Sequence, residues 1–114
     1  MATTGRSARK KGHGLERDIC KILNSIGFIA VTSRSESKRL DDLGGDIVSD
    51  FPFHIQAKFV ERMSMPIHEL LKSMAKAMPD KPPSVWHKRA NKNIVVSLQL
   101  DDFLDLCKII LKKA

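Results

Sequence analysis

Residues 53–59 read FHIQAKF and alternate strictly between apolar and polar side chains. The apolar residues fall on one side of an extended chain, and His54, Gln56 and Lys58 fall on the other. A period of two predicts a half-buried strand. The polar side of this strand is either an ordinary solvated face or the wall of a functional site, and the surrounding sequence decides between them.

The chain on both sides of this strand divides into alternating helical and extended patterns. Apolar residues recur at helical spacing from Leu15 to Ile26, and Gly27 is well placed to end that helix. Bulky and β-branched residues over 28–32 predict a buried strand. A polar loop, SRSESKRLDDLGG, follows over 33–45. Asp46 opens a second short strand before the strand at 53–59.

The second half of the chain repeats this alternation. Ser64 and Pro66 mark the start of a helix whose apolar face carries Ile67, Leu70, Leu71, Met74 and Met78. Residues 84–89 and 93–100 predict two more strands, joined by a turn at ANKN. Asp101 or Asp102 is expected to cap a last helix carrying Phe103, Leu104, Cys107, Ile110 and Leu111.

The resulting order, α-β-β-β-α-β-β-α, predicts an α/β fold with a central mixed β-sheet flanked by helices. The 114 residues fit one domain, placed at 14–114. Residues 1–13 are small, polar and basic and are expected to form a flexible arm. No internal repeat is found.

The charge of the chain points to a polyanionic partner. Lysine and arginine number 20 against 13 acidic residues, which gives a net charge of +7. Such a surplus of positive charge on a small domain favours nucleic acid as the partner. The alternative is a basic surface that has no specific partner. The candidate DNA-binding residues form three clusters: Arg9, Lys10 and Lys11; Arg34, Lys38 and Arg39; and His87, Lys88 and Arg89 beside Trp86. Trp86 either stacks on a base or, as is more usual for a lone Trp in a strand, belongs to a core or an interface.

The cysteines and apolar runs suggest a cytoplasmic protein. Cys20 and Cys107 lie far apart in helical patterns, so buried free thiols in a reducing compartment are expected. The histidines lack zinc-site spacing. No apolar run is long enough to span a bilayer, and the basic start has no apolar core for secretion.

Four residues combine ionisable or metal-binding groups with positions suited to presenting them. Glu16 lies in the first turn of the first predicted helix, and Asp46 follows two glycines at the start of a strand. Gln56 and Lys58 share one face of the next strand. Mg²⁺ prefers oxygen ligands, usually one or two carboxylates with waters and phosphate. A neighbouring lysine stabilises developing charge or orients the attacking water, so this set suits phosphodiester hydrolysis.

Each of these residues also has a purely structural interpretation. Glu16 is an acid favoured by the helix dipole, and Asp46 is a turn residue. Gln56 and Lys58 belong to a solvated strand face. The functional interpretation is preferred, because the structural interpretations require several independent coincidences at once.

The segments GHGLERDICKILNSIGF, GGDIV and IQAK resemble, in this order, the PD-(D/E)XK nucleases, and most closely the archaeal-type and phage Holliday junction resolvases. The likeness runs from about Lys10 through Phe59. It implies a restriction-endonuclease-like core and a homodimer that cuts branched DNA with Mg²⁺ or Mn²⁺. Asp46 would match the metal-binding aspartate, Lys58 the catalytic lysine and Glu16 the supporting glutamate. The family also uses a loop serine, for which Ser37 and Ser35 are candidates.

Gln56 departs from the family pattern, which has Glu or Asp at this position. An amide oxygen still ligates a hard cation but adds no charge. The open alternatives are an active enzyme with a neutral ligand, a compensating acid at Asp41, Asp42 or Glu61, and a weakened nuclease. The first is favoured because both Asp46 and Lys58 are present.

The sequence therefore predicts a Mg²⁺-dependent endodeoxyribonuclease, a Holliday junction resolvase, in a bacterial, archaeal or phage-infected host cell. Its predicted catalytic residues are Glu16, Ser37, Asp46, Gln56 and Lys58, with Glu16, Asp46 and Gln56 as metal ligands. No membrane and no small-molecule cofactor are expected. The alternatives are a nuclease or nickase for flaps or duplex DNA, and a non-catalytic nucleic-acid-binding protein on a degenerate nuclease fold.

Overall fold

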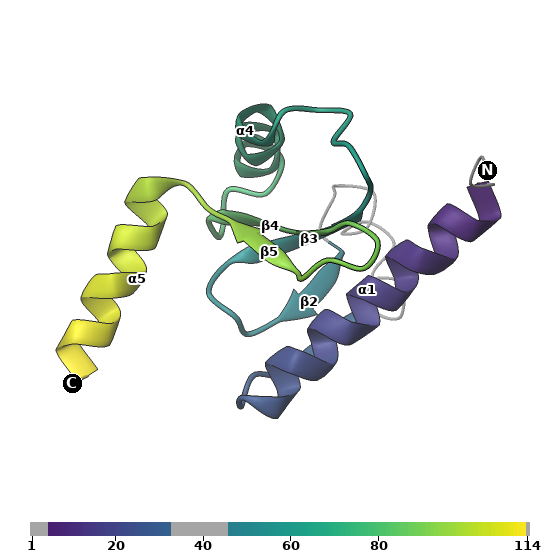
Figure 1. The fold of residues 1–114 in the computed structure, drawn as a ribbon. Coiled ribbons are helices and arrows are strands. Elements are labelled where there is room, and N and C mark those ends of the chain that lie inside the picture. The colour runs from purple at the N-terminus through teal and green to yellow at the C-terminus, as the bar shows by residue number, and fades with distance from the viewer. Residues whose placement is uncertain (1–4, 33–45, 114) are drawn as a thin grey trace.

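The computed structural model describes residues 5–32 and 46–113, with side chains from Lys10 onward. The predicted order of elements is confirmed (Figure 1). These elements are α1 (Gly5–Ser25), β1 (Ala30–Thr32), β2 (Ile47–Ser49), β3 (His54–Phe59), α4 (Ile67–Ala77), β4 (Pro83–Lys88), β5 (Val95–Ser97) and α5 (Leu100–Lys113).

The five strands form one sheet in the order β1-β2-β3-β4-β5. Neighbouring strands are antiparallel except β3 and β4, which run parallel in a register that sets Gln56 beside Val85 and Lys58 beside His87. The chain returns from β3 to β4 through α4, because parallel neighbours need a crossover connection. The predicted mixed sheet is therefore confirmed.

Two helices cover opposite faces of this sheet. Leu15, Ile19 and Leu23 of α1 pack with Ile47, Ile55 and Trp86 on one face. On the other face, Val85 packs with Leu70, Leu71 and Met74 of α4 and with Met78, which follows the helix. Ile55 and Val85 point to different faces because side chains alternate along a strand. The methionines of α4 thus belong to the core, as predicted.

Trp86 belongs to the core on the α1 face rather than to an exposed stacking platform. Its side chain is buried, and its Nε1 donates to Ser84 Oγ at 3.1 Å. Phe51 packs edge-on against it, with 5.9 Å between ring centroids. Of the interpretations offered for this residue, core packing is the one that the structure supports.

Helix α1 begins earlier than its apolar pattern indicates. It is helical from Gly5, so the arm expected to be flexible over 1–13 is helix within its described part. The physical reason is that Arg, Lys and Ala in this segment favour helix without needing a core-facing stripe. Its end follows the prediction: Gly27 has a φ of 112°, and Phe28 N donates to Leu23 O at 3.0 Å.

The C-terminal region differs from its prediction in two ways. Strand β5 ends at Ser97, and Leu100 is the first residue of α5, so Asp101 and Asp102 lie in its first turn and do not cap it. Helix α5 has no buried residue within the described chain and stands away from the sheet (Figure 1). Phe103, Leu104, Ile110 and Leu111 of this helix are exposed.

Both cysteines are free, as expected, but only Cys20 is buried, while Cys107 is partly exposed. No helix in the described ranges has the length and apolar character needed to cross a membrane.

Candidate functional site

Asp46 is held at the N-terminal end of β2 by two contacts to β3. Its backbone N donates to Ile55 O at 3.1 Å, and its Oδ2 accepts from Ala57 N at 2.7 Å. The carboxylate therefore occupies a place where a backbone carbonyl would continue the ladder. This arrangement fixes the Asp46 carboxylate against β3 at Ala57, the residue between Gln56 and Lys58.

Gln56 lies next to Asp46 across the two strands. The strands β2 and β3 are antiparallel, with Ile47 opposite Ile55. Asp46, one residue before Ile47, therefore lies opposite Gln56, one residue after Ile55. Gln56 Oε1 is buried and has no hydrogen-bond partner in the described part of the chain. An unsatisfied buried oxygen is costly. A hard cation beside the Asp46 carboxylate would satisfy it, so this donor pair fits Mg²⁺ or Mn²⁺.

Lys58 shares the sheet face of Gln56, two residues further along β3. It lines a small cavity of about 130 Å³ with Val60, Met63, Ser64, Met65 and Leu70. Its neighbour in β4 is His87, whose Nε2 lies 2.9 Å from Ser97 Oγ. The structure thus brings Asp46, Gln56 and Lys58 to one face of two adjacent strands.

Glu16 comes from the other side of the sheet. It is only 8% exposed, on a helix that packs against Ile55 and Ala57. Burial, and secondarily the Glu16 charge, raise the pKa of the Cys20 thiol one turn later. The structure buries this acid. Its role beside the metal stays a prediction, because α1 covers the face of the sheet opposite to Gln56 and Lys58.

The residues predicted from the loop lie outside the described residues. These are the candidate serines Ser35 and Ser37, the basic residues Arg34, Lys38 and Arg39, and the acids Asp41 and Asp42. Glu61, the third candidate for a compensating acid, binds Ala90 N at 3.1 Å and Arg89 Nε at 3.4 Å. These contacts, led by the Ala90 hydrogen bond, hold the pKa of Glu61 below its usual value.

Two basic clusters that are far apart in the sequence meet at the ends of β3 and β4. Lys11 Nζ from α1 and Lys88 Nζ from β4 each lie 5.8 Å from the centre of the Phe59 ring. Arg89 follows Lys88, and Lys10 precedes Lys11 on an exposed part of α1. His87 points to the opposite face of β4 from Lys88. The structure therefore joins part of the predicted DNA-binding set and separates His87 from it.

The contacts of His54 were not foreseen. Its Nε2 lies 2.8 Å from Asp80 Oδ1, across a separation of 26 residues. The hydrogen bond from His54 is the largest cause that lowers the pKa of Asp80. No local pattern signals this pair, because the parallel register of β3 and β4 creates it.

Within the described ranges, no group of three His, Cys, Asp or Glu side chains is arranged to hold a metal ion. The donor pair at Asp46 and Gln56 includes an amide and lies outside such a group. A cation here would thus depend on few protein ligands, with water and phosphate supplying the rest.

The chain is similar to one solved Holliday junction resolvase. That structure, from the archaeal hyperthermophile Archaeoglobus fulgidus, is 21% identical and gives a TM-score of 0.49, with 73% of this chain and 72% of that chain covered. No family model matches the chain, and no curated protein sequence matches it.

Proposed function

We propose that this protein is a metal-dependent, structure-selective DNA endonuclease, a Holliday junction resolvase that works as a homodimer. The observation that carries the proposal is the Asp46 carboxylate, fixed by Ala57 N beside Gln56, whose buried Oε1 has no partner among the described residues. Lys58 on the same strand face completes the set. An acid, an oxygen donor and a lysine on adjacent strands suit attack on a phosphodiester.

The residues take distinct roles in this proposal. Asp46 and Gln56 hold Mg²⁺ or Mn²⁺, with support from Glu16. When bound, such a cation stabilises charge on the phosphate and lowers the pKa of a water. Lys58 orients the attacking water or stabilises the charge that develops on the phosphate oxygens. Ser37 remains a candidate for a further contact to this site.

The basic surface at Lys10, Lys11, Lys88 and Arg89 lies at the ends of β3 and β4 and would hold DNA. Its side chains come from α1 and from the end of β4, and the Nζ atoms of Lys11 and Lys88 lie over the Phe59 ring. Lysine and arginine contacts to phosphates are independent of sequence and sensitive to salt. Such a surface suits a nuclease that recognises the shape of branched DNA.

A second candidate function is a non-catalytic DNA-binding protein on a degenerate nuclease fold. The observation that favours it is Gln56, because an amide brings no negative charge to the metal. A third possibility within the enzyme class is cleavage of flaps or plain duplex.

One assay separates these functions. The full chain is incubated with a four-way junction, a flap and a linear duplex, each with Mg²⁺ or with EDTA. Paired, symmetric cuts in the junction that require Mg²⁺ are the expected result. Equal cutting of all three substrates would replace the resolvase with a general nuclease. Binding without any cleavage, unchanged by Lys58→Ala, would support the non-catalytic alternative.

A further inference from the structure

Glu61 is an acid that lies within the basic surface. It follows the end of β3 by two residues and is bound by the segment that follows β4. Ala90 N donates to Glu61 Oε1 at 3.1 Å, and Arg89 Nε donates to Glu61 Oε2 at 3.4 Å. The parallel register of β3 and β4, which pairs Phe59 with Lys88, brings these residues together. One backbone N–H and one guanidinium therefore hold this carboxylate.

A lysine of α1 adds to the positive charge around Glu61. The hydrogen bond from Ala90 is the main cause that holds the pKa of Glu61 below its usual value, and the charges of Arg89 and Lys11 act in the same direction. Lys11 Nζ also lies 5.8 Å from the centre of the Phe59 ring. Glu61 is thus an anion among cations that come from two distant parts of the sequence.

The groups that hold Glu61 are those that hold phosphates in nucleic-acid complexes. Backbone N–H groups, arginine and lysine supply much of the contact to DNA phosphates. A guanidinium accommodates carboxylate and phosphate in similar ways. A phosphodiester, like a carboxylate, spreads one negative charge over two terminal oxygens. The chemistry of the place that Glu61 occupies therefore suits a DNA phosphate.

The Ala90 donor belongs to a turn that has its own stabilising contacts. Lys92 N donates to Arg89 O at 3.1 Å. Asn91 has a φ of 61°, a conformation that asparagine tolerates better than most residues. Because the turn is closed by its own hydrogen bond, the Ala90 N–H keeps its direction when one acceptor is exchanged for another.

The contact between Glu61 and Arg89 is easily displaced. The two side chains are 64% and 62% exposed. Exposed ion pairs contribute little to stability, because water and salt screen their charges. Release of Glu61 therefore costs the fold little, and a polyanion that presents several phosphates competes well for Arg89.

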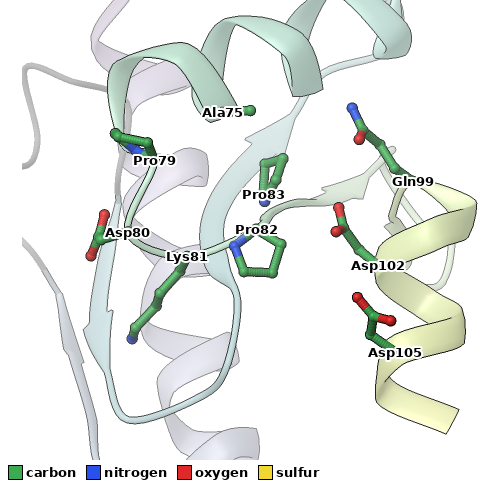
Figure 2. Close-up of a pocket in the computed structure, with 9 residues that line it drawn as sticks. All are labelled: Ala75, Pro79, Asp80, Lys81, Pro82, Pro83, Gln99, Asp102 and Asp105. Carbon is green, nitrogen blue, oxygen red and sulfur yellow. The ribbon is translucent and has the colours of Figure 1, made fainter. Parts of the chain in front are cut away.

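The opposite end of β4 is acidic. A hollow of about 390 Å³ lies between the start of β4 and α5. Figure 2 shows Asp102 and Asp105 directed from α5 toward this hollow, across from Pro82. These carboxylates repel phosphates, whereas the lysines and arginine at the other end of β4 attract them. A polyanion is therefore drawn to the end of β4 at which Glu61 lies.

We propose that Glu61 occupies a phosphate-binding site formed by Ala90 N, Arg89 and Lys11, and that a phosphate of bound DNA displaces its carboxylate. The proposal rests on the DNA-binding surface of the proposed function, to which it adds a backbone donor and an internal competitor. Glu61 lowers the affinity for DNA of any sequence, because phosphate contacts carry no sequence information.

The test is the affinity of the full chain for a linear DNA duplex, measured by fluorescence anisotropy at low salt in EDTA. Glu61→Gln removes the competing charge and keeps the size of the side chain, and it is expected to bind the duplex about three- to tenfold more tightly. Asp105→Asn is the matched control. It removes the same charge and also breaks an exposed ion pair, with Lys108 at 3.8 Å, but it lies at the acidic hollow. Its affinity should stay within about twofold of wild type.

Two further measurements locate this gain. In an Arg89→Ala background, Glu61→Gln is expected to raise the affinity by less than about twofold, because Glu61 no longer competes for that guanidinium. In NMR spectra of wild type, the backbone amide of Ala90 is expected to shift when duplex is added, as its acceptor changes from carboxylate to phosphate. The amide of Asp105 should not shift.

Four results would overturn the proposal. These are a wild type that binds no duplex, equal affinities of Glu61→Gln and Asp105→Asn, a full gain in the Arg89→Ala background, and an Ala90 amide that bound duplex does not move. Cleavage and preference for junctions do not enter a binding measurement in EDTA on linear DNA. A chain that gives the expected affinities but cuts no DNA would thus reject the proposed nuclease and leave this phosphate site standing.

Discussion

Gln56 is the residue on which the candidate site depends most. A glutamine in a strand face needs no explanation when it is solvated, but here its Oε1 is buried without a partner in the described chain. Asp46 lies opposite it and is fixed by Ala57 N. A cation bound beside Asp46 would give this oxygen a partner, which is the role that the proposed function assigns to Gln56.

Replacing Gln56 by Glu tests its role as a ligand. Without metal, Gln56→Glu places a second negative charge beside Asp46 and should lower the melting temperature. With metal, the added charge should tighten Mn²⁺ binding about tenfold, as measured by calorimetry without DNA. Gln56→Ala is the control and should weaken binding. Equal Mn²⁺ affinity in wild type and both variants would show that residue 56 is not a ligand.

The Asp80–His54 pair gives a pH-dependent contribution to stability. The pKa of Asp80 is lowered from its ordinary value of 3.8, chiefly by the hydrogen bond from His54. A carboxyl with a lowered pKa in the folded state stabilises the fold above its unfolded pKa, and this contribution is lost as pH falls through the lowered value.

Asp80→Asn should therefore reduce the melting temperature at pH 6. The difference from wild type should shrink as the pH is lowered below 3.8 in a series of thermal melts. Asp18→Asn on the exposed side of α1 serves as the control and should show little difference at any pH. A deficit for Asp80→Asn that stays constant down to pH 2.5 would contradict the assigned linkage.

At the scale of elements, local patterns predicted what each segment is but not where each one ends. Two patterns were sufficient to predict a strand and a helix: the alternation of 53–59 and the helical spacing of Leu15, Ile19 and Leu23. Both elements bury one face, and this burial determines the pattern of apolar residues. The start of α1 at Gly5 was missed because exposed Lys and Arg continue a helix without an apolar signal.

Helix α5 shows what periodicity cannot decide. Its apolar stripe was visible in the sequence, yet the same pattern describes a helix on its own sheet and a helix on a partner. The candidate site shows a similar limit. The positions of Asp46, Gln56 and Lys58 along two strands predicted that their side chains meet on one face. Which face of the sheet α1 covers depends on how the chain crosses the sheet, and no local sequence pattern determines this.

The packing of α1 yields a stability prediction. Ile19 is completely buried between α1 and the sheet, while Ile22 is 43% exposed on the same helix. Ile19→Ala should lower the free energy of unfolding by about 2–5 kcal/mol, because it removes buried methyl groups and leaves a cavity. Ile22→Ala should cost less than about 1 kcal/mol. Urea unfolding measures both, and equal losses would contradict the assigned face.

At the scale of the whole molecule, the proposed function uses two surfaces of one small domain. We propose that the strand face with Asp46, Gln56 and Lys58 carries the chemistry. The basic surface around Phe59, on the α1 side of the sheet, would supply phosphate contacts.

The most direct test of the central claim is a single-turnover cleavage measurement on a four-way junction, comparing wild type with Asp46→Asn at saturating protein. Asp46→Asn keeps an oxygen for Ala57 N but removes the charge that holds the cation. We expect Mg²⁺-dependent cleavage by wild type and a cleavage rate at least about 100-fold lower in Asp46→Asn, with junction binding retained. Cleavage by Asp46→Asn at the rate of wild type, or no cleavage by a folded wild type that binds the junction, would contradict it.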